Sequence, residues 1–213
     1  GASQVMLDGS ELVAGSMGDL GCFSFFPSKN MAVGGEGGML TTTVDELTDA
    51  VSLVVNHGRS PSLESMQLGS NLRMSEVSAA IGTVQLSHLD SWVERRREIA
   101  EIYHQAFVDH PLLDTPNVRP GAKHAWHQYC LSTEYPDELV THLDQHGIDA
   151  RRYYVTPCHR QNVFAKHPQH GQILPVTAIL SSTLVAIPVM HELRDDEIER
   201  IIAAVTSFSV LQH

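Results

Sequence analysis

The sequence is poor in cysteine and in basic residues, and it has no long apolar run. Its 213 residues include three scattered cysteines, Cys22, Cys130 and Cys158, without a C-x-x-C pair. Neither a disulfide framework nor a zinc ribbon is therefore expected, and a reducing cytoplasm is the favoured location. No apolar run reaches the about 18 residues of a membrane span, and no secretory signal opens the chain. A membrane protein is not expected.

Basic residues are outnumbered, with 14 lysines and arginines against 25 acidic residues and a net charge of −11. Proteins that bind nucleic acid present a basic footprint, so nucleic acid is not an expected partner. Histidine is plentiful, but its spacing fits no strong zinc pattern, and packed or solvated histidines are favoured over a metal site. The candidate ligands of such a metal site are His124, His127, Cys158, His159, His167 and His170.

The first half of the chain alternates strand and helix signals. Residues 4–17 predict strands joined by a hairpin turn at Asp8-Gly9, and residues 21–26 predict an aromatic strand that Pro27 stops. Residues 39–43 predict a further strand. Asp45 is expected to cap a helix that runs to about Asn56 and ends at Gly58.

A long helical pattern follows. It begins at Ser75, continues through the apolar residues up to Trp92, and is extended by the stretch 94–107. The run Arg95-Arg96-Arg97 is interpreted as a solvated helix face in preference to a phosphate site.

The second half mixes shorter elements. Residues 111–123 contain three prolines and predict a connector. The expected division is therefore an α/β first domain, residues 1–110, and a small α+β second domain, residues 111–213. Within the small domain the patterns predict strands at 126–132 and 148–155, an extended segment at 185–189, and helices at 136–146, 175–182 and 195–208.

The stretch Gly18 to Asn30 has the strongest chemical signal. Lys29 follows an aromatic strand, with serines before it and a glycine cluster, residues 34–38, after it. An apolar pocket would lower the pKa of a lysine and make its amine a nucleophile, and serine hydroxyls can donate to phosphate. On composition alone, a surface lysine followed by an ordinary loop is the favoured interpretation, because the glycines match no P-loop or dinucleotide fingerprint.

Several collinear motifs favour a functional role for Lys29 over the interpretation as a surface lysine. The lysine stretch matches the pattern G-D-x-G-x-F-S-F-x-P-x-K-N, and Asn56-His57-Gly58, the segment 69–76 and the segment 92–103 continue the match. In these motifs the chain closely resembles the DegT/DnrJ/EryC1/StrS family of pyridoxal-phosphate-dependent sugar aminotransferases, which have fold type I. The resemblance continues through short matches to the C-terminal part of the chain. It implies part of a fold-type I large domain, mostly a parallel sheet with helices, followed by the small domain.

The resemblance also implies roles for single residues. Lys29 would form the Schiff base with pyridoxal phosphate and then move a proton between substrate and cofactor. Ser24 would bind the cofactor phosphate, and Asn71 would bind the phosphate of the neighbouring subunit's cofactor, which implies a homodimer. Gln4 would lie near the ring hydroxyl, and Asn30 would shape the turn. The alternatives are an ordinary strand serine for Ser24 and a helix-entry residue for Asn71.

The implied reaction is transamination of a keto sugar, attached to a nucleotide, with glutamate as the amino donor. A related branch that dehydrates sugars has histidine in place of Lys29. Family members also have an N-terminal half, with an aspartate for the pyridine nitrogen; its counterpart here would be Gly1. A separate N-terminal polypeptide is therefore a possible partner. The alternative function is a truncated, non-catalytic remnant or a regulatory or scaffold protein of the same fold.

Overall fold

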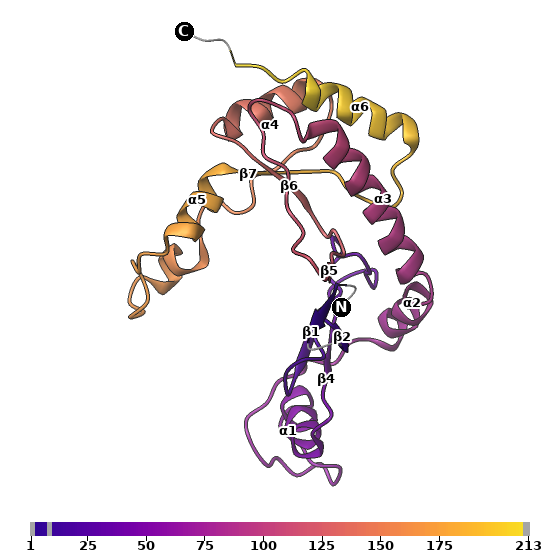
Figure 1. Ribbon diagram of the computed structural model, residues 1–213. Coiled ribbons are helices and arrows are strands. Elements are labelled where there is room, and N and C mark those ends of the chain that lie inside the picture. The colour runs from indigo at the N-terminus through magenta and orange to yellow at the C-terminus, as the bar shows by residue number, and fades with distance from the viewer. Residues whose placement is uncertain (1–2, 8–9, 211–213) are drawn as a thin grey trace. The chain divides into compact units, whose positions relative to one another are not determined.

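The chain consists of two compact units, described here from a computed structural model that covers residues 3–7 and 10–210 (Figure 1). The first unit comprises Gly1–Glu94 and Val118–Ala125, and the second comprises Arg95–Asn117 and Trp126–His213. Within the described residues, no helix is both long and apolar enough for a membrane crossing. The strand pairs in these residues are all antiparallel, so the parallel strands expected in the large domain are not among them.

The first unit contains two small sheets, with strand orders β2-β1-β5 and β3-β4. In the first sheet Leu7 pairs with Ser10, which confirms the predicted hairpin; its turn residues, Asp8 and Gly9, lie outside the described residues. The connector that follows the long helices contributes the short β5 to this sheet. The strands are β1 (Gln4–Leu7), β2 (Ser10–Val13), β3 (Gly21–Ser24), β4 (Gly38–Thr41) and β5 (Ala122–Lys123).

The helices of the first unit begin and end differently from the prediction. In α1 (Asp45–Val55) the N-cap is Val44, so the prediction that Asp45 caps the helix was wrong. Asp45 is instead the first helical residue, where a carboxylate is favoured by the positive end of the helix dipole.

The long helix predicted from Ser75 was also wrong as a single element. It is divided into α2 (Glu76–Leu86) and α3 (Leu89–Phe107). At the break, the hydroxyl and the backbone N–H of Ser87 both donate to Val84 O, at 2.7 and 3.2 Å. Such bonds compete with the i→i+4 ladder and tighten the last turn, which ends the helix.

The first unit has a small core. Its buried cluster consists of Phe25, Met31 and Val33, with Phe23, Met74 and Leu89 partly buried against it. The apolar stripe expected along α2 is largely exposed, with Val84 63% exposed and Leu86 60% exposed. No residue of α1 that the structure describes is buried. The apolar faces of both helices are therefore left uncovered in this chain.

The second unit is built on the antiparallel pair β6 (Tyr129–Ser132) and β7 (Leu184–Ile187). Asp114 extends the pair beside β6, and Arg151 extends it beside β7, each through a single bridge. The helix α4 (Pro136–Gln145) packs on β7 and beside α6 (Asp195–Thr206), as Figure 1 shows. The remaining elements are η1 (Cys158–Arg160), η2 (Asn162–Phe164) and α5 (Pro175–Thr183).

The strand predicted at 148–155 was wrong, because only Arg151 pairs with β7. The side chain of the next residue, Arg152, contacts two helices. The Arg152 guanidinium donates to Asp137 Oδ1 at 2.8 Å and to Ser182 O at 3.0 Å. These contacts attach the chain to the ends of α4 and α5 and leave the rest of the predicted strand irregular.

The core of the second unit is much larger than that of the first. Side chains from both strands and from α3, α4 and α6 form one buried cluster. Its largest fully buried members are Ile99, Tyr103, Phe107, Tyr129, Leu131, Leu139, Leu143, Val185 and Val205. The second unit therefore has a complete core of its own.

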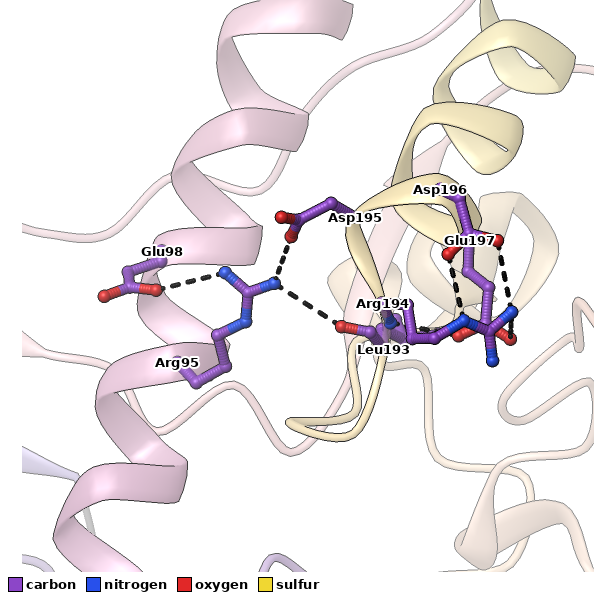
Figure 2. Close-up of polar contacts among 7 residues, drawn as sticks. All are labelled: Arg95, Glu98, Leu193, Arg194, Asp195, Asp196 and Glu197. Atoms are coloured by element: carbon purple, nitrogen blue, oxygen red, sulfur yellow. Dashed lines mark hydrogen bonds and ion pairs between the residues drawn. The ribbon is translucent and has the colours of Figure 1, made fainter.

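The arginine run on α3 does not form a solvated face, so that interpretation was wrong. Arg96 is buried, and its Nη1 donates to Trp126 O at 3.0 Å and to Val189 O at 3.1 Å. Burial lowers the pKa of Arg96. Figure 2 shows that Arg95 connects α3 to the start of α6, through Asp195 Oδ1 at 2.6 Å.

Candidate functional site

The predicted lysine lies in a tight turn directly after β3. Phe25 is buried behind the strand end, and the Lys29 N–H donates to Phe26 O at 2.9 Å. Pro27 occupies the second position of this turn, where its fixed φ is favourable. The side chain of Lys29 is half-buried, whereas Phe26 is exposed. Of the phenylalanines in the aromatic strand before Lys29, Phe25 lies in the core of the unit and Phe23 packs against it.

Ser24 lies at the end of β3 with its hydroxyl proton available to a ligand. Its Oγ accepts a hydrogen bond from the Phe26 N–H at 3.3 Å. A serine hydroxyl has one donor in addition to its acceptor lone pairs. Because the backbone contact uses an acceptor position, the exposed hydroxyl can still donate, as a phosphate ligand must.

Asn30 attaches the lysine turn to a distant part of the chain. Its Nδ2 donates to Ala125 O at 2.7 Å. Its Oδ1 is buried and has no hydrogen-bond partner in the residues that the structure describes. Buried polar atoms are rarely left in this state, so the oxygen is suited to a donor from outside this set of residues. Asn30 therefore ties the residue after Lys29 to Ala125 and also presents a buried acceptor next to Lys29 in the sequence.

Ser3, the neighbour of Gln4, is linked to the lysine turn through the same residue, Ala125. The Ala125 N–H donates to Ser3 Oγ at 3.1 Å, and Gln4 pairs with Lys123 in the β1-β5 ladder. The structure thus brings the strand of Gln4 next to the segment of Lys29 and Asn30, although these residues are far apart in sequence. Gly1, the counterpart of the family's aspartate, lies outside the described residues.

Asn71 lies in a separate part of the first unit, where the chain returns past the end of α1. It forms an antiparallel bridge with Asn56, and its Oδ1 accepts from Arg73 Nε at 3.1 Å. The Arg73 Nη1 donates to Asn56 Oδ1 at 2.6 Å. Asn56 and Arg73 belong to matched motifs, yet the sequence did not single them out, because only the fold brings them together.

The chemical groups of these residues fit part of a pyridoxal phosphate site. Lys29 provides an amine, Ser24 a hydroxyl donor, and Asn30 an acceptor in a buried position. Asn71 provides amide donors at some distance along the chain. Among the described residues, no three His, Cys, Asp or Glu side chains are grouped so that they could hold a metal ion.

Comparison with protein-family models gives a match over most of the chain. The model of the DegT/DnrJ/EryC1/StrS aminotransferase family matches residues 8–206. The chain spans about half the length of the curated relatives that it matches. The relatives therefore contain a further segment of similar size.

Two relatives illustrate the range of names in the family. The chain is 36% identical to a UDP-N-acetyl-3-dehydro-alpha-D-glucosamine 3-aminotransferase of Acidithiobacillus ferrooxidans, over 88% of this chain and 50% of that protein. It is 33% identical to a pleiotropic regulatory protein of Geobacillus stearothermophilus, over 91% of this chain and 53% of that protein.

Solved structures confirm the predicted fold class. S. venezuelae DesV, solved in complex with a ketimine intermediate, superposes with a TM-score of 0.87 at 29% identity, over 96% of this chain and 54% of that one. A DegT DnrJ EryC1 StrS aminotransferase from Brucella abortus gives a TM-score of 0.86 at 30% identity, over 96% and 53%. The chain has about half of a fold-type I aminotransferase fold.

Proposed function

Because the chain belongs to the DegT/DnrJ/EryC1/StrS aminotransferase family, we propose that it supplies the lysine-bearing half of a pyridoxal-phosphate-dependent sugar aminotransferase. The observation that carries this proposal is the turn after β3. There the half-buried Lys29 follows Ser24, whose hydroxyl can donate, and precedes Asn30, whose buried Oδ1 has no hydrogen-bond partner among the described residues.

The proposed substrate is a keto sugar linked to a nucleotide, with glutamate as the amino donor. The names of relatives support a nucleotide sugar, including the dTDP-3-amino-3,4,6-trideoxy-alpha-D-glucose transaminase of Streptomyces venezuelae, which is 31% identical to the chain. The glutamate donor and the position of the keto group rest on the family resemblance.

Four residues of the chain would each have a separate role toward the cofactor and the substrate. Pyridoxal phosphate supplies an aldehyde and an electron-accepting ring. The Nζ of Lys29 would hold the cofactor, and once freed it would move a proton between the substrate carbon and the cofactor carbon. Ser24 would donate to the phosphate, and Asn30 would fix the turn while its Oδ1 accepts from a group beside Lys29. Gln4 would lie near the ring hydroxyl of the cofactor.

A second protein segment is needed to complete this site. Val77, Ile81 and Val84 lie on one face of α2, at helical spacing, and all three are exposed, Val77 at 72%. Exposed apolar stripes of this kind mark interaction surfaces. We propose that a homodimer and the segment equivalent to the relatives' other half cover the first unit, with Asn71 reaching the partner's cofactor.

The three unpaired cysteines support a cytoplasmic location.

Cofactor binding tests the proposal on the chain as it is. Pyridoxal phosphate is added, and the visible absorption of lysine-bound cofactor is recorded for the wild type, for Lys29→Ala and for Lys166→Ala. Lys166 is an exposed loop lysine and serves as the matched control. Absorption that is lost only in Lys29→Ala is the expected result. No absorption in the wild type, or equal absorption in all three proteins, would contradict the proposal.

One observation favours a second candidate, a non-catalytic protein of the same fold. The first unit has a very small buried cluster, whereas the second unit has a large one. A chain that relies only on its second unit could act as a regulatory or scaffold protein. This candidate predicts no cofactor absorption with the wild type at any cofactor concentration.

A further inference from the structure

Arg73 contacts two asparagine side chains at once. Its Nε donates to Asn71 Oδ1 at 3.1 Å, and its Nη1 donates to Asn56 Oδ1 at 2.6 Å. A guanidinium group has only donors, so each amide must turn its oxygen toward it. The orientation of both amides therefore follows from chemistry alone. Their NH₂ groups must point elsewhere.

The backbone beneath these three residues is tightly tied. Asn56 and Asn71 form an antiparallel bridge, the His57 N–H donates to Ser70 O at 3.0 Å, and the Leu72 N–H donates to Val55 O at 3.0 Å. The two strands of this bridge hold the amides on a common frame. Arg73 then removes the remaining freedom of the two side chains, because its planar fork fits both oxygens.

The amides and the arginine together suit an anion. Two NH₂ groups offer four N–H donors, and the guanidinium adds positive charge close to them. Asn71 and Arg73 are exposed, so a ligand from solvent or from another chain can reach them. A fully ionised phosphate monoester has only acceptors and matches this set.

We propose that Arg73 is a positioning residue that holds the amides of Asn56 and Asn71 as a two-sided clamp for a phosphate group. This inference rests on the proposed function, in which Asn71 meets the phosphate of a partner's cofactor. It adds Asn56 as a second ligand and assigns Arg73 a role that acts through both asparagines. Arg73 also contributes charge, but charge alone does not fix the direction of the donors.

The test uses nuclear magnetic resonance of the side-chain amide groups in the full chain, labelled with nitrogen-15. Inorganic phosphate is titrated into the wild type, Arg73→Met and Arg73→Lys. The expected wild type has ordered NH₂ groups on both asparagines, and both shift with phosphate. In Arg73→Met both groups are expected to become as mobile as that of the exposed Asn117, with phosphate bound roughly tenfold more weakly, the loss of about one charge-assisted hydrogen bond.

Two further variants separate position from charge. Arg73→Lys keeps the charge but has no fork, so it is expected to leave the amides mobile and phosphate binding weakened. Asn71→Asp keeps an oxygen for Arg73 and removes the N–H donors, so it is expected to lose phosphate binding, while Asn117→Asp does not. Backbone amide shifts of residues 54–72 that match the wild type show that each variant is folded.

Three results would overturn the clamp. The first is a wild type whose Asn56 and Asn71 amides do not shift with phosphate. The second is Arg73→Met with unchanged amide order. The third is an Arg73→Lys variant that binds phosphate as tightly as the wild type. That result would mean that Arg73 contributes only its positive charge to phosphate binding. None of these results affects the absorption test of Lys29. The clamp can therefore be overturned while the proposed function stands, and the reverse is also true.

The source of the phosphate group is decided by two more titrations. Pyridoxamine phosphate carries a phosphate monoester, as the cofactor does, and uridine diphosphate represents the nucleotide of the substrate. A stronger response of Asn71 to pyridoxamine phosphate is expected. A stronger response to uridine diphosphate would support the clamp but overturn its assignment to the cofactor.

Discussion

At the scale of single residues, Gly58 and Gly147 share one backbone conformation and differ in the space around them. Both have φ of +69°. A Cβ on Gly58 would lie 1.8 Å from Gln67 O, whereas a Cβ on Gly147 would meet nothing within 4 Å. A comparison of alanine substitutions at the two glycines therefore separates the effect of backbone strain on stability from the effect of close packing.

Gly58→Ala is expected to lower the free energy of unfolding by about 1 to 3 kcal/mol more than Gly147→Ala, because only Gly58 is also overpacked. Urea-induced unfolding of the two variants and the wild type measures the difference. Equal losses would mean that the segment around Gly58 is not tied to residues 66–72 in the way described.

His110 makes the stability of the second unit depend on pH. Burial lowers its pKa from the ordinary value of 6.5, and backbone contacts with Phe208 and Thr206 oppose this only in part. The unfolded chain therefore binds the proton more readily than the folded chain. Stability from this group is present above about pH 6.5 and is lost as the pH falls below that value.

In His110→Gln, the fall in unfolding free energy between about pH 7 and pH 5 is expected to become shallower than in the wild type. Urea unfolding at several pH values measures the slope. The exposed His170→Gln is the control and is expected to leave the slope unchanged. A steeper slope in His110→Gln would contradict the account.

The residues of the candidate site were predictable only in part. Lys29, Ser24 and Asn30 lie in one continuous motif, so local sequence was sufficient to single them out as candidates. Asn56 and Arg73 were not singled out, because their partnership depends on a bridge between segments that are 15 residues apart, Asn56 to Asn71. No local pattern encodes the direction of a side chain across such a bridge.

At the scale of elements, the buried Arg96 could have been recognised from helix geometry. Successive helical residues are about 100° apart, so three adjacent arginines cannot all share one face. Arg96 precedes Ala100, Tyr103 and Phe107 at helical spacing, and these residues are buried. The prediction of a solvated face relied on the charge of the run. Arg96 is buried because it lies on the apolar stripe of the helix.

Arg96→Met is expected to lower the free energy of unfolding by about 2 kcal/mol or more, because it leaves Trp126 O and Val189 O without their donor. Arg200→Met, on the exposed side of α6, is expected to change it by less than about 0.5 kcal/mol. Urea unfolding compares the two. A stable Arg96→Met protein would show that the buried guanidinium contributes little, as some replaced buried ions do.

Element types were predicted better than element ends. The helices α1, α4, α5 and α6 have clear apolar periodicity and lie within two residues of their expected ends. The break at Ser87 was missed because serine is compatible with a helix and reveals its competing hydrogen bonds only in three dimensions. A strand was predicted at 148–155 from its β propensity, but it does not form, because long-range contacts of Arg152 override that propensity.

At the scale of the whole chain, the two units differ in how much they bury. The second unit has a contiguous core, and the first has a small cluster with exposed helix faces. Local stability follows buried apolar contacts. The first unit is therefore expected to depend on further protein for its stability.

Hydrogen exchange measures this difference directly. Backbone amides of β6, β7 and α6 are expected to exchange much more slowly than those of β3, β4 and α1 in the isolated chain. Similar protection in both units would contradict the conclusion that the first unit lacks cover.

The central claim is that Lys29 holds the cofactor, and the chain has only three lysines at which to test it, Lys29, Lys123 and Lys166. The most direct measurement is to incubate the chain with pyridoxal phosphate, reduce the lysine-bound cofactor with borohydride, and map the modified peptide by mass spectrometry. We expect the mass of the reduced cofactor on Lys29 alone. Modification spread over the three lysines, or confined to Lys123 or Lys166, would contradict the account.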